Sequence, residues 1–205
     1  MLFLFELFGS VAFAISGALV AIDKKMDIFG VSFLSMTTAV GGGILRDVIL
    51  NITPPAAFRE PIFMIVSLLA GVCVFFFAKY HINPLAKPKW LLLLQVMDSI
   101  GLAIFTVMGV QTAYTQAINQ TVYSVVFVGA MSGIGGGVLR DILAGDTPVV
   151  LVEQFYACAS ILGAIVCALA WPFCSNFAAM LIGAATIIVL RFLAVYYHWN
   201  LPKVI

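Results

Sequence analysis

Seven stretches of apolar residues, each long enough to cross a bilayer, occupy nearly the whole chain. A helix spans the hydrocarbon core with about 20 predominantly apolar residues. The polar or proline-containing breaks between the stretches are short, so we expect no extramembrane domain. The sequence therefore predicts an all-α integral membrane protein with seven transmembrane helices, at 2–22, 28–50, 61–79, 90–114, 121–144, 154–174 and 177–197.

The composition excludes a water-soluble fold and several classes of function. Of the 205 residues, 63% are hydrophobic and only 9% are charged, against about 25% charged in soluble domains. The net charge of +1 offers no basic surface for nucleic acid. The two His and four Cys have no metal-ligand spacing, and no nucleophile–base pair is present in the sequence. We expect a single membrane domain over 1–205 with membrane lipids as partners, without a cofactor, a resident metal or enzymatic activity.

The basic residues of the loops predict the orientation of the chain. Seven spans place alternate loops on opposite sides of the membrane, and cytoplasmic loops carry an excess of Lys and Arg. One side receives all the lysines of the loops and tail, whereas the other receives Arg59. We expect a multi-pass protein of the plasma (inner) membrane with its N-terminus outside and its C-terminus in the cytoplasm. The lysines are Lys24, Lys25, Lys79, Lys87, Lys89 and Lys203.

The chain contains an internal repeat. Residues 41–50 read GGGILRDVIL and residues 135–144 read GGGVLRDILA, 94 positions later. With an offset of 92, five residues of the first span, Glu6, Gly9, Phe13, Gly17 and Ala21, match Asp98, Gly101, Phe105, Gly109 and Ala113. Each repeat, 2–80 and 90–175, holds three spans. Because three is odd, the second repeat must enter the membrane in the opposite sense, which is the inverted-repeat plan of many transporters and some channels. The seventh helix, 177–197, lies outside the repeat.

The two glycine runs predict irregular helices in the second and fifth spans. Each glycine weakens a helix by about 1 kcal/mol relative to Ala, and lipid cannot satisfy freed backbone groups. We expect both helices to be kinked near the midplane, with freed carbonyls that bind monovalent cations transiently. Close helix packing is the alternative, but two symmetric runs favour a lined pathway. The candidate pore residues are Gly41, Gly42, Gly43, Gly135, Gly136 and Gly137.

Charged residues at membrane depth are the second candidate set: Arg46, Asp47, Arg140, Asp141 and Asp98. Neighbours on a helix point about 100° apart, so neither Arg–Asp pair is expected to close on itself. The repeat instead predicts cross pairs, Arg46 with Asp141 and Asp47 with Arg140, or either arginine with Asp98 or Glu6. Such charges face a bundle interior or a water-filled path, so the pairs either clamp the repeats or gate the pathway. Arg191, near the end of the last span, is expected to extend to the cytoplasmic headgroups.

The doubled G-G-G-x-x-R-D motif, on spans two and five of a chain with three, three and one spans, resembles the prokaryotic branch of the trimeric intracellular cation (TRIC) channel family, also labelled the glycine transporter domain family. The resemblance covers essentially the whole chain. It implies a homotrimer in which each protomer holds its own pore, kinked at the two glycine runs and permeable to K⁺ and, less selectively, to Na⁺. The family's intramembrane charges carry over onto Arg46, Asp47, Arg140 and Asp141.

The sequence is therefore consistent with two transport functions. The first is a passive channel for monovalent cations, K⁺ and also Na⁺. The alternative is a secondary transporter of a small zwitterion such as glycine, in which Asp47, Asp98 or Asp141 would hold the ammonium group. Inverted repeats serve both functions, so the sequence barely separates the small inorganic cation from the small amino acid as the transported species.

Overall fold

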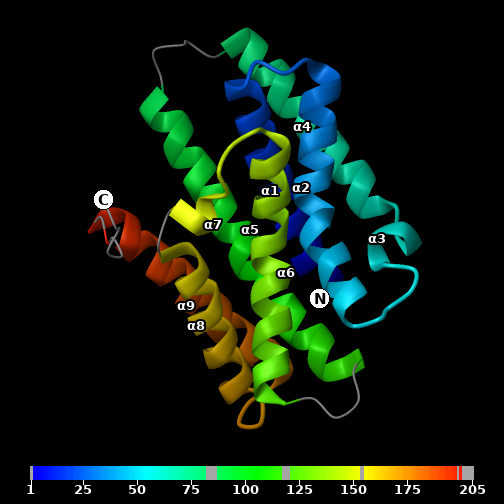
Figure 1. Ribbon diagram of the computed structural model, residues 1–205, viewed down its shortest axis with the longest axis vertical. Helices are drawn as coiled ribbons and strands as arrows, with labels where there is room; N and C mark the ends of the chain where they lie inside the picture. The colour runs from blue at the N-terminus through cyan, green and yellow to red at the C-terminus, as the bar shows by residue number, and fades with distance from the viewer. Residues whose placement is uncertain (1, 82–86, 117–120, 153–154, 198, 200–205) are drawn as a thin grey trace.

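The computed structural model describes residues 2–81, 87–116, 121–152, 155–197 and 199. The predicted loops at 82–86 and 117–120, and the tail that contains Lys203, lie outside the described residues. Within them the chain forms a bundle of helices (Figure 1). The helices are α1 (Leu2–Asp23), α2 (Ile28–Ile49), α3 (Ala56–Arg59), α4 (Ile62–His81), α5 (Lys87–Gln116), α6 (Val122–Leu143), α7 (Val149–Val152), α8 (Phe155–Ala170) and α9 (Asn176–Tyr196).

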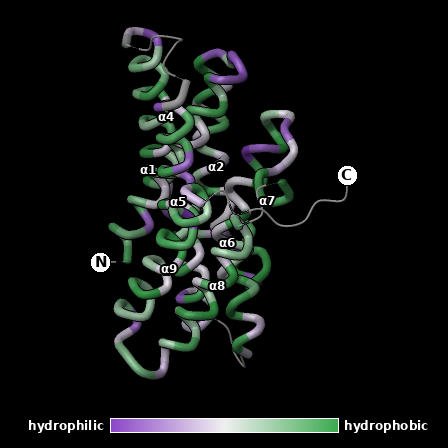
Figure 2. The backbone as a smooth tube through the Cα atoms, turned by 90° about the vertical axis from the view of Figure 1, so that its left-hand side faces the viewer, coloured by the Kyte–Doolittle hydropathy of each residue, from purple (hydrophilic) through white to green (hydrophobic). Residues whose placement is uncertain are grey.

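Six of these helices, α1, α2, α4, α5, α6 and α9, are long and apolar enough to cross a membrane. The protein is therefore a multi-pass membrane protein, and Figure 2 shows apolar residues along most of the helical tube. The predicted span 154–174 is shorter in the structure, because α8 has only 16 residues, or about 24 Å of helix. The short helices α3 and α7 were not predicted from the sequence. Helix α3 lies between α2 and α4 in the chain, and helix α7 lies between α6 and α8.

Helices α2 and α6 end in the same way, at positions 94 residues apart. Asn51 and Gly145 both adopt left-handed backbone conformations, with φ of 56° and 76°. In the residue after each of them, the backbone N–H donates to the carbonyl five positions back, Asp47 in α2 (2.8 Å) and Asp141 in α6 (2.9 Å). These bonds satisfy carbonyls that the last helical turn leaves free. The end of each helix thus places an Arg–Asp pair in its final turns.

The glycine runs bring α2 and α6 into close contact, and they do not interrupt either helix. Both helices continue through their three glycines, so neither is divided there into the two half-helices that the sequence suggested. A Cβ atom on Gly42 would lie 2.1 Å from the Ser132 carbonyl oxygen, and one on Gly136 would lie 2.4 Å from the Thr38 carbonyl oxygen. The glycines thus allow two backbones to touch, as small residues do in membrane bundles. Because each helix is continuous, its backbone hydrogen bonds are made within the helix itself.

The contacts of α2 with α6 run in opposite directions along the two helices. Thr38 faces Gly136, whereas Gly42, one turn later in α2, faces Ser132, one turn earlier in α6. The helices are therefore antiparallel where they cross, as Figure 1 also shows. Consequently their C-terminal ends, with the two Arg–Asp pairs, lie toward opposite ends of the bundle.

A pair of phenylalanines lies beside this crossing. The rings of Phe13 in α1 and Phe105 in α5 stack with centroids 5.3 Å apart and planes within 4° of parallel. Both side chains are buried, and the Phe13 ring lies 3.2 Å from the position of a Cβ atom on Gly136. The centre of the bundle is thus filled by two aromatic rings and by the glycine faces of α2 and α6.

Candidate functional site: two buried charge clusters

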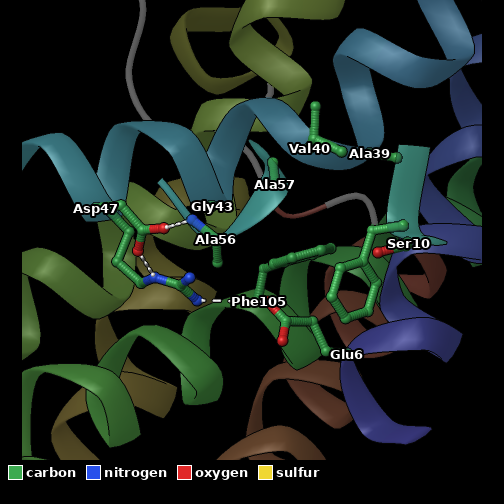
Figure 3. A pocket seen from close by; sticks show the side chains of 11 residues that line it. Glu6, Ser10, Ala39, Val40, Gly43, Asp47, Ala56, Ala57 and Phe105 are labelled. Atoms are coloured by element: carbon green, nitrogen blue, oxygen red, sulfur yellow. Dashed lines mark hydrogen bonds and ion pairs between the residues drawn. The ribbon is translucent and has the colours of Figure 1, made fainter. Parts of the chain in front are cut away.

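The first charge cluster consists of Glu6, Arg46 and Asp47. The Nε of Arg46 donates to Oδ1 of the next residue in the helix, Asp47, at 2.8 Å. Its Nη1 lies 3.7 Å from Glu6 Oε1, beyond hydrogen-bond distance. Asp47 Oδ2 accepts the backbone N–H of Ala56 at 2.7 Å, so the carboxylate also fixes the start of α3 (Figure 3).

The second charge cluster consists of Asp98, Arg140 and Asp141, with Ser16 from α1. Arg140 Nε donates to Asp141 Oδ1 at 2.8 Å, and Arg140 Nη1 contacts Asp98 Oδ1 at 2.5 Å. Arg140 Nη1 also donates to Ser16 Oγ. Asp141 Oδ2 accepts the backbone N–H of Val149 at 2.8 Å, at the start of α7. All three charged residues are at most 4% exposed.

These contacts correct the predicted pairing of the charges. In the described structure each arginine pairs with the aspartate that follows it, and with Glu6 or Asp98. Of the predicted pairs with Glu6 or Asp98, Arg46–Glu6 and Arg140–Asp98 are present. The cross pairs Arg46–Asp141 and Asp47–Arg140 are wrong. An arginine side chain is long enough to fold over the roughly 100° that separates neighbours on a helix. The antiparallel crossing also directs the two Arg–Asp pairs toward opposite ends of the bundle.

A small cavity lies in the first cluster. Its volume is about 20 Å³, which is enough for one water molecule. Arg46 Nη1, which is buried, has no hydrogen-bond partner among the described residues. Because 3.7 Å is too long for a direct hydrogen bond to Glu6, a water in this cavity would give Arg46 Nη1 a partner. The cavity is lined by Glu6, Ser10, Ala39, Val40, Gly43, Arg46, Asp47, Ala56, Ala57, Phe63 and Phe105.

The second cluster is filled at the equivalent place by Tyr156. A Cβ atom on Gly43 would meet only Arg46 Nη2, at 3.9 Å, whereas one on Gly137 would lie 3.0 Å from Tyr156 Oη. Phe63 occupies the position of Tyr156 in the first half, since each is the second residue of its helix, α4 or α8. The tyrosine hydroxyl is thus the group that occupies the space beside the third glycine in the second half.

Arg191 of α9 belongs to the surroundings of the second cluster, which corrects the expectation that it reaches the headgroups. It is 3% exposed. Its Cζ lies 4.8 Å from the centre of the Tyr156 ring, and its Nε donates to Ser99 Oγ at 3.4 Å. A guanidinium over an aromatic face gains cation–π energy that is largest when desolvated. This contact accounts for a cation buried in an apolar helix.

The sequence missed Ser16, Tyr156 and the role of Phe13 with Phe105. The repeat aligns Phe13 with Phe105, and this match could have predicted their contact. Phenylalanines in membrane spans, however, more often face lipid or fill packing space. Ser16 and Tyr156 have no polar counterpart in the other repeat. Ser16 corresponds to Met108 at an offset of 92, and Tyr156 corresponds to Phe63 at an offset of 93. Among the described residues, no group of three or more His, Cys, Asp and Glu forms a candidate metal site.

A family model described as glycine transporter matches two segments of the chain, residues 3–79 and 95–172. The two segments begin 92 residues apart, which is the offset that relates Phe13 to Phe105. A structure solved to explain conductance through TRIC cation channels is 37% identical, covers 98% of this chain and 95% of its own, and has a TM-score of 0.84. The chain belongs to the TRIC family.

Two further proteins resemble the chain over nearly its whole length. The TRIC trimeric intracellular cation channel orthologue from Rhodobacter sphaeroides is 32% identical, with 97% of this chain and 98% of that chain covered and a TM-score of 0.87. The inner membrane protein YadS of Escherichia coli is 35% identical over 199 residues, which is 96% of this chain and 93% of YadS. The matched lengths therefore include the parts of this chain that hold both charge clusters and the glycine crossing.

Proposed function

We propose that this protein is a channel for monovalent cations, K⁺ and also Na⁺, with a pathway inside each protomer. The observation that carries the proposal is its likeness to TRIC cation channels over 98% of the chain at 37% identity. The pathway would run past the first charge cluster, between the glycine faces of α2 and α6, and past the second cluster. We further propose that the two matched segments are inverted repeats around this crossing, with α9 as a seventh transmembrane helix outside them.

The tight crossing and the stacked phenylalanines would then form the barrier of the closed state. An apolar constriction blocks ions by excluding water, and it conducts once widened. In our proposal, α2 and α6 bend at Gly41–Gly43 and Gly135–Gly137 when the pathway opens. The kinks predicted from the sequence would then be present in the conducting state. Monovalent cations would then bind transiently beside these glycines, without a resident cofactor.

The charge clusters would shape the cation path on either side of this barrier. In each cluster two carboxylates outnumber one arginine, so the formal charge of the cluster is −1, which favours a monovalent cation over an anion. Each arginine would lower the local cation affinity and so let the ion leave. The same ion pairs would thus both hold the repeats together and control the passage of cations.

The homotrimer and the membrane orientation are part of the same proposal. The orthologue from Rhodobacter sphaeroides is named a trimeric channel, and YadS is named an inner membrane protein. We infer that this chain forms a homotrimer in the plasma (inner) membrane, with its N-terminus outside and its C-terminus in the cytoplasm. The first cluster would then lie in the outer half of the membrane and the second cluster in the inner half.

Purified protein in liposomes tests the proposed function. We expect K⁺ flux without added substrate and discrete single-channel current steps in planar bilayers. Saturable glycine uptake that collapses with a cation gradient would instead identify the transporter. Arg46→Ala should raise the unitary K⁺ conductance, because it leaves two carboxylates beside the path. Arg59→Ala is the matched control, since Arg59 is exposed in α3. An Arg46→Ala variant that folds normally with wild-type conductance would place the pathway elsewhere.

A further inference from the structure

Helix α9 lies outside the two segments that match the family model, yet it places a charged residue in the protein interior. Arg191 is 3% exposed, packs over the ring of Tyr156 and donates to Ser99 of α5. Burying an ionised residue in a membrane protein is costly, and such residues generally serve a function. The position of Arg191 points to Tyr156 as the group through which it acts.

Tyr156 Oη is the atom nearest to a Cβ position on Gly137, at 3.0 Å, and in the described part of the chain it has no counterpart within 4 Å of the Cβ position on Gly43. Its side chain is buried, and its Oη has no hydrogen-bond partner among the described residues. Within 4 Å of the position of a Cβ atom on Gly137 lie Tyr156 Oη, Arg140 Nη2 and Asp98 Oδ1. The hydroxyl therefore lies among the groups that a cation would pass in the second cluster.

The formal charges differ between the clusters once Arg191 is included. Glu6 and Asp47 face one arginine in the first cluster, which leaves a charge of −1. In the second cluster, Arg191 joins Arg140 beside two aspartates, which brings the formal sum to zero. A cation would thus meet both a hydroxyl in its path and a site without net negative charge.

We propose that Arg191 is a positioning residue that holds Tyr156 in the second cluster and so keeps that half of the pathway closed. Helix α9 is then a regulatory element, and a movement of α9 that withdraws Arg191 frees the tyrosine ring and restores the negative charge of the cluster. This proposal rests on the proposed cation channel and adds to it the element that controls one half of the path.

Single-channel recording of Arg191→Gln, Tyr156→Ala and the double variant tests the coupling between the two residues. Arg191→Gln and Tyr156→Ala should each raise the ratio of open to closed time by about tenfold, an effect within the range of a desolvated cation–π contact. The double variant should show no further increase over Tyr156→Ala, because Arg191 acts through the ring. Arg191→Lys, which keeps a cation near the ring, should lie closer to the wild type. Phe63→Ala is the matched control in the first half. Combined with Arg191→Gln, it should leave the effect of Arg191→Gln on the ratio of open to closed time intact.

Thiol labelling provides a readout that does not need cation flux. In a variant with all four cysteines replaced by alanine, Ser16→Cys places a thiol beside Arg140 and Asp98. We expect slow labelling by a small water-soluble methanethiosulfonate, and faster labelling when Arg191→Gln or Tyr156→Ala is added. Equal labelling rates in all three proteins would overturn the proposal. So would an Arg191→Gln effect on open time that persists in the Tyr156→Ala background.

The two readouts also separate this proposal from the proposed function. One outcome is that the wild-type protein passes no cations while the labelling rate still depends on Arg191 and Tyr156. In that case the proposed channel function is wrong, and the proposed closure of the second cluster by Tyr156 is supported. If Arg191→Gln does not fold, Tyr156→Ala and Arg191→Lys decide the outcome. Unchanged labelling in Tyr156→Ala then overturns the closure by itself.

Discussion

The two charge clusters are built from matching sequence but differ in how completely they are filled. In the first, Arg46 Nη1 lies 3.7 Å from Glu6, beside a cavity of about 20 Å³. In the second, Arg140 Nη1 contacts both Asp98 and Ser16, and Tyr156 fills the space beside Gly137. The repeated motif thus sets the Arg–Asp pairs, whereas residues outside the motif decide whether the surroundings are open or closed.

The largest expected effect distinguishes the two arginines. Arg140→Gln should lower the free energy of unfolding by about 3–5 kcal/mol, because it leaves buried carboxylates without their partner. Arg46→Gln should cost clearly less, since its contact with Glu6 is long and the adjacent cavity admits water. Denaturant titration of the purified protein in detergent measures both values. Equal losses would remove the distinction between a filled and an open cluster.

The glycine crossing should show the next largest effect, and it should be symmetric. Gly42→Ala and Gly136→Ala each place a Cβ atom against a backbone carbonyl, of Ser132 and Thr38, where the helices must separate to admit it. We expect losses of about 1–3 kcal/mol each, typical of overpacking, in the same unfolding assay. A neutral result at both positions would mean that the helices do not touch there.

The third glycine of each run should respond differently in the two halves. Gly43→Ala meets nothing closer than 3.9 Å, so the higher helix propensity of alanine should stabilise the protein by up to ~1 kcal/mol. Gly137→Ala meets Tyr156 Oη at 3.0 Å, and we expect it to lose most or all of that gain. Paired thermal melts measure the difference. A Gly137→Ala variant as stable as Gly43→Ala would show that Tyr156 does not fill the second half.

The smallest effect concerns the surface between the halves. Lys24, after α1, forms an ion pair with Asp146, after α6, and both side chains are partly exposed. Lys24→Gln should change the free energy of unfolding by about 0–1 kcal/mol, and less at high ionic strength. Melts at low and high salt test this. A loss that persists at high salt would indicate a stronger coupling of the two halves than an exposed pair provides.

The sequence predicted most of the fold because length and hydropathy determine membrane spans. Seven of the helices match predicted spans, although α5 is longer and α8 shorter than expected. The short helices α3 and α7 were missed, since four residues after a proline carry no periodic pattern. The glycine runs were located correctly but interpreted as interruptions, because sequence alone does not reveal that a facing backbone fills the space a side chain would occupy.

The site was predicted in part for a similar reason. The repeat identified Arg46, Asp47, Arg140, Asp141 and Asp98 as buried charges, and the structure brings each arginine to its carboxylates. Which carboxylate each arginine contacts follows from the antiparallel crossing of α2 with α6, which the inverted repeat predicted and which is incompatible with the expected cross pairs. Tyr156 and Arg191 could not be predicted, because they meet only through the packing of α8 on α9, outside any motif.

An anomalous diffraction map of the protein crystallised with Tl⁺, a monovalent cation that substitutes for K⁺, tests whether cations pass inside each protomer. We expect Tl⁺ peaks within a single protomer, beside Glu6 and Asp47 in the first cluster and near the crossing of α2 with α6. Tl⁺ peaks found solely between protomers would contradict this expectation, because the cations would then pass outside the bundle that holds the two clusters.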